Sequence, residues 1–172
     1  TPTPPAVAKA GYTFTGWDQT ITAATANKTY TAQWLINQYT ITFDSAGGSD
    51  VPAITQDYGT TVITPAAPDR IGYTFIGWMP AVPAAMPAGD MTCVAQWAIN
   101  QSTIDFDSAG GSAVSSITQD YGTVIIPPEN PVRTGYTFTG WLPALPATIP
   151  AIGMTCVAKW SIKYYSITFD AN

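Results

Sequence analysis

The sequence predicts a mostly β protein made of tandem small modules, with little or no helix. The first observation is an internal repeat, because aromatic and cysteine positions recur at a 63-residue step. The second is a period of two in the apolar residues of each repeat, which is typical of half-buried strands. The third is the frequency of proline, which breaks helix interiors. The residues that mark the step are Trp34, Trp97 and Trp160; Phe43, Phe106 and Phe169; Trp78 and Trp141; and Cys93 and Cys156.

The first half of each repeat predicts a strand, a turn and a weaker strand. In residues 39–43, apolar side chains alternate with threonines, so we expect a strand with one apolar face. Residues 46–48 predict a turn, because glycine permits positive φ. A weaker strand is expected over residues 54–58. The same succession starts again 63 residues later.

The second half predicts two more strands, over residues 73–78 and 91–97. In the later one, alternate residues share one face of the strand. In the earlier one, strict alternation puts Trp78 on the face opposite Phe75, so one of the two would be partly exposed. The residues expected on the shared face are Met91, Cys93, Ala95 and Trp97.

Helices have little room in this chain. Five prolines punctuate the middle repeat between residues 65 and 87, and each would break a helix interior. One helical turn near residues 65–69 remains as an alternative. The longest stretch without Pro or Gly, residues 17–46, is interpreted as strand, short linker and strand.

The repeats divide the chain into two complete units and two partial ones. The links over residues 35–38 and 98–101 have four residues each and contain no glycine. Links of that kind are too short for free flexing, so we expect an elongated, semi-rigid array and a window onto a longer tandem series. The expected parts are 1–34, the second half of a unit; 39–97 and 102–160, complete units; and 165–172, the opening strand of a further unit.

Composition excludes several classes of function. The formal net charge is −5 with only six Lys and Arg, whereas nucleic-acid binding needs clustered basic side chains. No apolar run is long enough to span a membrane, so no membrane insertion is expected. The first residues do not have the pattern of a secretion signal, and any such address is expected outside this sequence.

The chain offers little catalytic or metal chemistry. It contains no histidine, the most frequent general base and metal ligand, so we expect no enzymatic activity, no cofactor and no metal site. Cys93 and Cys156 are interpreted as free buried thiols, with intermolecular pairing as the alternative. Asp44 and Asp107 are interpreted as Asx turns, with calcium ligation as the alternative.

Four motifs, in the same order in successive repeats, identify a family. They are Tyr-x-Ile-x-Phe-Asp…Gly-Gly (39–48), Tyr-Gly (58–59), Arg-x-Gly-Tyr-Thr-Phe-x-Gly-Trp (70–78) and Met-Thr-x-x-Ala-Gln-Trp (91–97). The chain closely resembles the Listeria–Bacteroides repeat, also called the internalin B-repeat. This resemblance implies a small β-grasp-like module without enzymatic activity, arranged in tandem in extracellular bacterial surface proteins.

The aromatic residues are the candidates for ligand contact. Tyr58 and Tyr121 lie beside glycine in expected loops, and Trp78 and Trp141 lie on expected strands. Exposed aromatic platforms can bind sugars or proteins. The alternative is that all four form the module core and the joints between modules, since so small a unit needs its aromatic residues inside.

The leading hypothesis for function is a spacer on the bacterial cell surface or in a secreted protein. Its expected partners are the neighbouring repeats, and it would present other domains. The alternative is an adhesin module that binds host protein or glycan through its aromatic residues. Residues 165–172 of one molecule could also complete residues 1–34 of the next by strand addition, as a property of the fragment.

Overall fold

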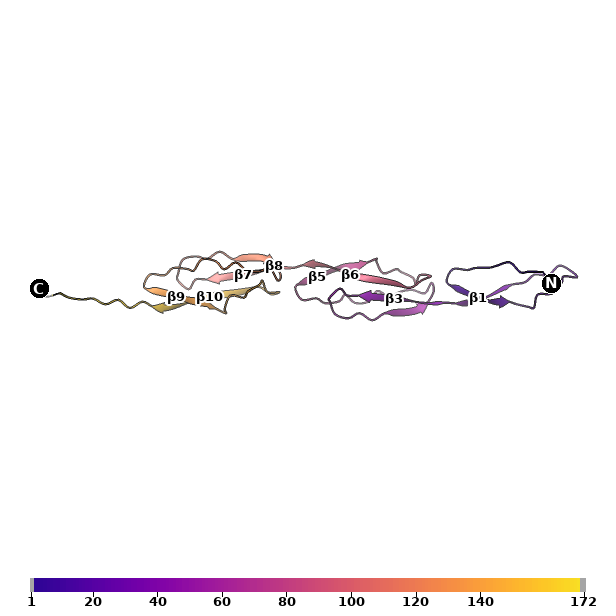
Figure 1. The fold of residues 1–172 in the computed structure, drawn as a ribbon, viewed down its shortest axis with the longest axis horizontal. Coiled ribbons are helices and arrows are strands. Elements are labelled where there is room, and N and C mark those ends of the chain that lie inside the picture. Colours follow the sequence, from indigo (N-terminus) through magenta and orange to yellow (C-terminus); the bar gives the residue numbers. More distant parts are fainter. Residues whose placement is uncertain (1, 171–172) are drawn as a thin grey trace. The chain divides into compact units, whose positions relative to one another are not determined.

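Segments in which threonine alternates with apolar residues, such as residues 39–43, form strands. The computed structural model describes residues 2–170, and every regular element in that range is a β-strand (Figure 1). The prediction of a mostly β chain of tandem repeated sheets is therefore confirmed. Residues 2–170 contain no helix, and therefore no helix in that range that could cross a membrane.

The second repeat folds as a four-stranded mixed sheet in the order β4-β3-β6-β5. The central strands β3 and β6 run parallel, with Phe43 opposite Cys93. The outer strand β4 pairs antiparallel with β3. This order, with parallel strands in the centre, is that of a β-grasp module. The strands are β3 (Gln38–Asp44), β4 (Ile54–Asp57), β5 (Tyr73–Met79) and β6 (Met91–Ile99).

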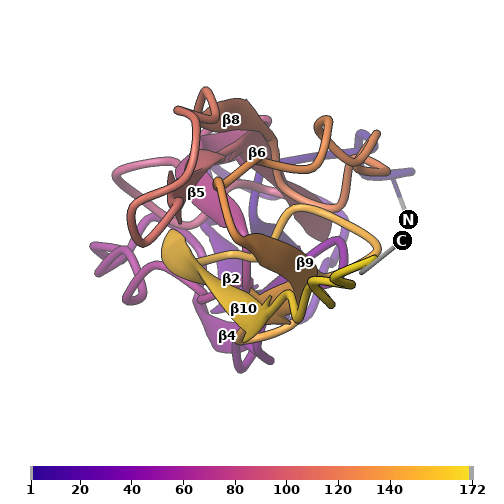
Figure 2. The same cartoon turned by 90° about the vertical axis from the view of Figure 1, so that its left-hand side faces the viewer.

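The third repeat has the same topology, in the order β8-β7-β10-β9. Its parallel pair places Phe106 opposite Cys156. Strands β9 and β10 pair antiparallel and lie side by side in Figure 2. The strands are β7 (Gln101–Asp107), β8 (Ile117–Asp120), β9 (Tyr136–Leu142) and β10 (Met154–Ile162).

Residues 2–37 contain only two strands. β1 (Tyr12–Trp17) and β2 (Ala32–Ile36) pair antiparallel, with Phe14 opposite Trp34. They correspond to β5 and β6 of the second repeat. The division into four parts at 1–34, 39–97, 102–160 and 165–172 stays a prediction.

The chain forms two compact units. The first contains residues up to Asp69 together with Phe75–Trp97, and the second contains Arg70–Thr74 together with residues from Ala98 onward. Five residues from the sequence of the second repeat therefore belong to the compact unit built on the third.

Each complete repeat has its own core at matching positions. Ile41 and Cys93 are fully buried in one repeat, and Ile104 and Cys156 in the other. The shared face expected for residues 91–97 is confirmed, because Met91, Cys93, Ala95 and Trp97 all contribute to the core. In place of a helix, an irregular segment inserts Met86, or Ile149 in the third repeat, each 1% exposed. Residues 65–69 form no helical turn.

The expectation that Phe75 and Trp78 lie on opposite faces is wrong. Their rings pack against each other with centroids 5.2 Å apart. The physical reason is an irregularity at Gly77, whose φ is +136°. In the third repeat the equivalent register shift leaves Thr139 without a partner between Phe138 and Gly140. A bulge of this kind re-aims the following side chain.

The acidic turn is an Asx turn, as expected. The Ala46 N–H donates to the Asp44 carboxylate at 2.8 Å, and the Ala109 N–H donates to Asp107 in the same way. The turn then passes over Trp97, whose Nε1–H donates to the Ser45 carbonyl at 2.9 Å. A Cβ on Gly48 would come within 2.6 Å of the indole. The glycine therefore allows the backbone to approach the ring closely.

Candidate functional site

The joints between repeats are the candidate functional site, and they are shorter than expected. β2 ends at Ile36 and β3 begins at Gln38, so only Asn37 lies outside a strand. At the next joint only Asn100 separates β6 from β7. The four-residue links expected from the sequence are thus mostly strand, because their apolar residues continue the pattern of the preceding strand.

Each joint asparagine is held through its backbone on both sides. The Asn37 N–H donates to the Gly11 carbonyl at 2.9 Å, and its own carbonyl accepts from the Tyr58 N–H at 2.9 Å. Asn100 makes the same two bonds, to Gly72 and from Tyr121. A residue bonded on both sides in this way lacks the freedom of a flexible linker.

The asparagine side chain adds a further bond at each joint. The Thr13 hydroxyl donates to the Asn37 Oδ1 at 2.6 Å, and Thr74 donates to the Asn100 Oδ1 at 2.6 Å. The Asn37 Nδ2 also donates to the Tyr39 hydroxyl at 3.3 Å. The joint therefore combines backbone and side-chain hydrogen bonds at one residue.

A tyrosine ring packs on a glycine at both joints. The Tyr58 ring lies against Gly11, and the Tyr121 ring lies against Gly72, where any Cβ would overlap it. Both glycines also have positive φ, +76° and +78°. Only glycine meets the two requirements together, since other residues are strained at positive φ and carry a Cβ.

A second tyrosine and a cation complete each joint. Tyr12 meets Tyr58 edge to face with centroids 6.0 Å apart, and Tyr73 meets Tyr121 at 6.1 Å. The Lys9 Nζ lies 3.8 Å from the centre of the Tyr12 ring. Such aromatic and cation–π contacts each contribute about 0.5–1.5 kcal/mol.

The third repeat carries the same elements, with no ring from residues 2–170 packed on its glycine. The Lys163 N–H donates to the Gly135 carbonyl at 2.8 Å, and Arg133 lies over Tyr136 at 4.0 Å. Gly135 has a φ of +81°, yet a Cβ there would meet nothing within 4 Å. Gly135 is thus a natural control for Gly72.

The structure separates the four residues singled out as ligand contacts into two pairs. Tyr58 and Tyr121 lie in the joints, half-buried. Trp78 is 9% exposed and packs against Phe43 and Phe75. Trp141 is half-buried and packs against Phe106 in the same way. Ligand binding by these residues stays a prediction.

Sequence reasoning missed the glycine and asparagine partners of the tyrosines. Gly72 belongs to the motif over residues 70–78 and Asn100 to the link over residues 98–101. Nothing in the sequence indicated that either residue contacts Tyr121. The available signal was the 63-residue step from Asn37 to Asn100, inside the links. The same residue type at equivalent positions of two links indicates that both asparagines have the same surroundings.

The titratable groups have simple surroundings. Burial raises the pKa of the Cys93 and Cys156 thiols, which are both free, as expected. Hydrogen bonding to Thr22 lowers the pKa of Tyr30. Within residues 2–170, no group of three or more His, Cys, Asp or Glu side chains is placed to hold a metal ion.

The strand order and the repeated joints define a class of protein: a tandem array of small β modules with built-in joints. The sequence profile of the Listeria-Bacteroides repeat domain matches residues 1–37, 39–96 and 103–145. Because these ranges cover more than half of the chain, the chain belongs to the Listeria-Bacteroides repeat family. The resemblance inferred from the motifs is confirmed.

Two curated relatives extend well beyond the matched segment. A protein of Evansella cellulosilytica named as a membrane protein is 34% identical over 99% of this chain. Internalin H of Listeria monocytogenes is 36% identical over 65% of it. The chain spans 29% and 21% of the length of these two relatives.

The solved structures that resemble this chain include a tandem repeat of a surface protein. Tandem SHIRT domains 3–4 from a streptococcal cell surface protein align with 73% of this chain and 98% of theirs, at 16% identity. The TM-score of this alignment is 0.24.

Proposed function

We propose that this chain is a non-enzymatic spacer in a bacterial cell-surface or secreted protein, where it holds other domains away from the surface. The observation that carries the proposal is the repeated joint. Tyr58 on Gly11 and Tyr121 on Gly72 recur with the same bonds at Asn37 and Asn100. A joint that recurs in this form restricts rotation between successive repeats.

The relatives support the location. One is named as a membrane protein and another is an internalin. The chain spans less than a third of either, as expected for one part of a long protein with other domains. The site chemistry supports a mechanical role, because its contacts are ring packing and hydrogen bonds between repeats.

Solution scattering on the intact chain tests the proposal. A compact globule of this length would have a radius of gyration of about 16 Å. A spacer with ordered joints gives a clearly larger radius while far-UV circular dichroism still reports folded strands. A folded chain with a radius near that of the compact globule would overturn the spacer role.

The alternative adhesin role is tested separately. The immobilised chain is exposed to a glycan array and to host-surface proteins, beside variants Tyr58→Ala and Tyr121→Ala. The spacer proposal expects no saturable binding. Saturable binding that both variants lose would replace it with an adhesin.

A further inference from the structure

The parallel strands of each complete repeat lie in the path of any tension carried along the chain. β3 opens the second repeat and β6 closes it, so tension that enters at residue 38 and leaves at residue 99 passes through both strands. Two parallel strands begin at the same end of the pair. The tension therefore pulls β3 backward and β6 forward along their own axes, and the pair is loaded in shear.

Shear strains the whole ladder between the two strands at once. Four successive residue pairs join the strands, from Ile41 opposite Met91 to Asp44 opposite Val94. Their hydrogen bonds run across the strands, so sliding strains all of them together, whereas peeling would break them one after another. Sliding would also drag the fully buried Ile41 and Cys93 past each other. In the third repeat, β7 and β10 form an equivalent parallel ladder of four pairs.

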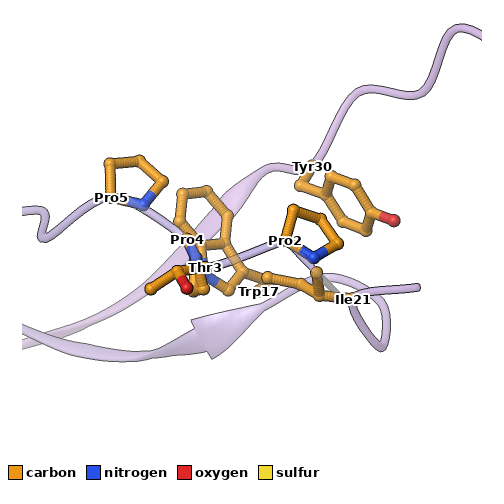
Figure 3. A pocket seen from close by; sticks show the side chains of 7 residues that line it. All are labelled: Pro2, Thr3, Pro4, Pro5, Trp17, Ile21 and Tyr30. Carbon is orange, nitrogen blue, oxygen red and sulfur yellow. The ribbon is translucent and has the colours of Figure 1, made fainter. Parts of the chain in front are cut away.

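The first two strands of the chain meet the same tension in a different direction. β1 and β2 pair antiparallel, with Tyr12 opposite Ile36. A load on these two residues acts at one end of the pair, so it opens the ladder bond by bond. At the other end, Trp17 borders a cavity of about 310 Å³, which Tyr30 and residues 2–5 also line (Figure 3). The chain thus contains a peeled pair as an internal reference for the two sheared pairs.

Side chains reinforce the sheared ladder of the second repeat. The Thr42 hydroxyl on β3 shares a hydrogen bond of 2.7 Å with the Thr92 hydroxyl on β6, and it donates to the Met91 carbonyl at 3.3 Å. The carboxylate of Asp90, directly before β6, accepts from the Thr40 N–H at 2.8 Å. These bonds cross the sheared pair, so sliding must break them together with the ladder.

The third repeat has other residues at the reinforcing positions. Asp105 replaces the threonine, and its carboxylate accepts from the Ser116 hydroxyl at 2.6 Å, directly before β8. Gly153 replaces the aspartate. The Ser102 hydroxyl donates to the Pro150 carbonyl, but Pro150 lies before β10 begins at residue 154. The bonds that reinforce the sheared pair in the second repeat are thus replaced in the third by bonds that do not include β10.

We propose that the parallel pair of each complete repeat is a mechanical clamp that resists unfolding under tension, and that the second repeat withstands a given tension for longer than the third. The use of this clamp in holding other domains away from a surface rests on the spacer role proposed above. The two proposals fail separately, because scattering decides the spacer and pulling decides the clamp.

Single-molecule pulling on the intact chain at constant force tests the clamp. At a 63-residue step per repeat, unfolding of a complete repeat lengthens the chain by about 20 nm. We expect two such events, the third repeat before the second, after a smaller gain from β1 and β2. The double variant Thr42→Asp/Asp90→Gly gives the second repeat the residues of the third, and it should make the later event as fast as the earlier one.

Thr42→Val and Thr55→Val form a matched pair of variants. Each removes one exposed threonine hydroxyl, but the Thr55 hydroxyl pairs with Thr40 at 2.8 Å between β3 and β4, outside the path of the tension. Thr42→Val should raise the unfolding rate of the second repeat at constant force by about two- to fivefold. Thr55→Val should leave that rate unchanged. Equal effects of the two variants would overturn the assignment of the sheared pair.

The direction of pulling separates a clamp from ordinary stability. In a variant with Asp50→Cys and Ala98→Cys, handles attach after β3 and near the end of β6, while Cys93 and Cys156 are replaced by alanine. Both attachment points lie towards the same end of the parallel pair, so this pull peels the ladder. At equal force, it should open the repeat faster than a pull on the ends of the same variant. Equal rates in the two directions, or a third repeat that outlasts the second, would overturn the proposal.

Discussion

At the scale of single residues, the turn after the opening strand contains a strained alanine. Ala46 and Ala109 have φ of +48° and +47°, although they carry a Cβ. A non-glycine residue in this region pays about 1–2 kcal/mol. The Asx bond from the preceding aspartate holds the turn in place at that cost.

Replacing this alanine by glycine should stabilise the protein. Ala46→Gly is expected to raise the free energy of unfolding by up to about 1 kcal/mol, because relief of strain exceeds the added entropy of glycine. Ala53, which is exposed and has no positive φ, supplies the control. Ala53→Gly should not raise the free energy of unfolding. Urea unfolding measures both, and a loss of stability in Ala46→Gly would contradict this account of the turn.

The joint glycines allow a matched pair of variants. Gly72→Ala and Gly135→Ala both place a Cβ at positive φ, but only the first meets a tyrosine ring. We expect Gly72→Ala to cost about 1–3 kcal/mol more than Gly135→Ala, as overpacking does. Thermal unfolding of the two variants makes the comparison. Equal losses would mean that Tyr121 contributes no packing at the joint.

The buried thiols make part of the stability depend on pH. Burial raises the pKa of Cys93 and Cys156 in the native state. The unfolded chain therefore releases these protons at lower pH, and their contribution to stability falls as pH rises above the unfolded value of about 8.5. The Cys93→Ala/Cys156→Ala double variant should lose less stability between pH 7 and pH 10. Identical losses in chemical denaturation would refute this assignment.

At the scale of elements, one hydrogen bond ties the acidic turn to the last strand. Trp97 donates to Ser45, whereas the Trp78 Nε1 is buried without a partner. Trp97→Phe should therefore destabilise the protein more than Trp78→Phe does, by about 1 kcal/mol. Trp78→Phe loses ring volume but also removes an unsatisfied donor. Denaturant titrations rank the two, and the reverse order would contradict the role given to the turn.

Strand positions followed from the sequence, but the facing of Trp78 within β5 did not. Alternation of apolar residues located β3, β5 and β6. It failed within β5, because the bulge at Gly77 turns Trp78 to the face of Phe75. A glycine inside a strand is a known signal for such a bulge. The bulge follows from packing across the sheet, which period two alone does not describe.

The joints show the same limit of local patterns. The links were located by the repeat, but the rigidity proposed for them depends on contacts between residues far apart in the chain. Tyr121 reaches Gly72 and Asn100 bonds both. A tyrosine beside glycine looks the same in the sequence whether it binds a ligand or a neighbouring repeat. Only the fold shows that Gly72 lies beneath the ring.

At the scale of the whole molecule, the proposed spacer function depends on how firmly one repeat holds the next. The same set of contacts occurs at Asn37 and at Asn100. A spacer gains from such repetition, because each added repeat brings its own joint. The alternative, flexible connection by unbonded linkers, would leave Asn100 without its two backbone bonds.

The distance between spin labels in successive repeats tests this account most directly. Ile63 and Ile126 occupy equivalent positions and are 82% and 84% exposed, so both accept a label. With Cys93 and Cys156 replaced by alanine, pulsed electron resonance should give a narrow distance distribution, and Tyr121→Ala should broaden it. If the distribution for the chain that retains Tyr121 is as broad as that of the Tyr121→Ala variant, the joint is not ordered by Tyr121. That result would contradict the proposed spacer role.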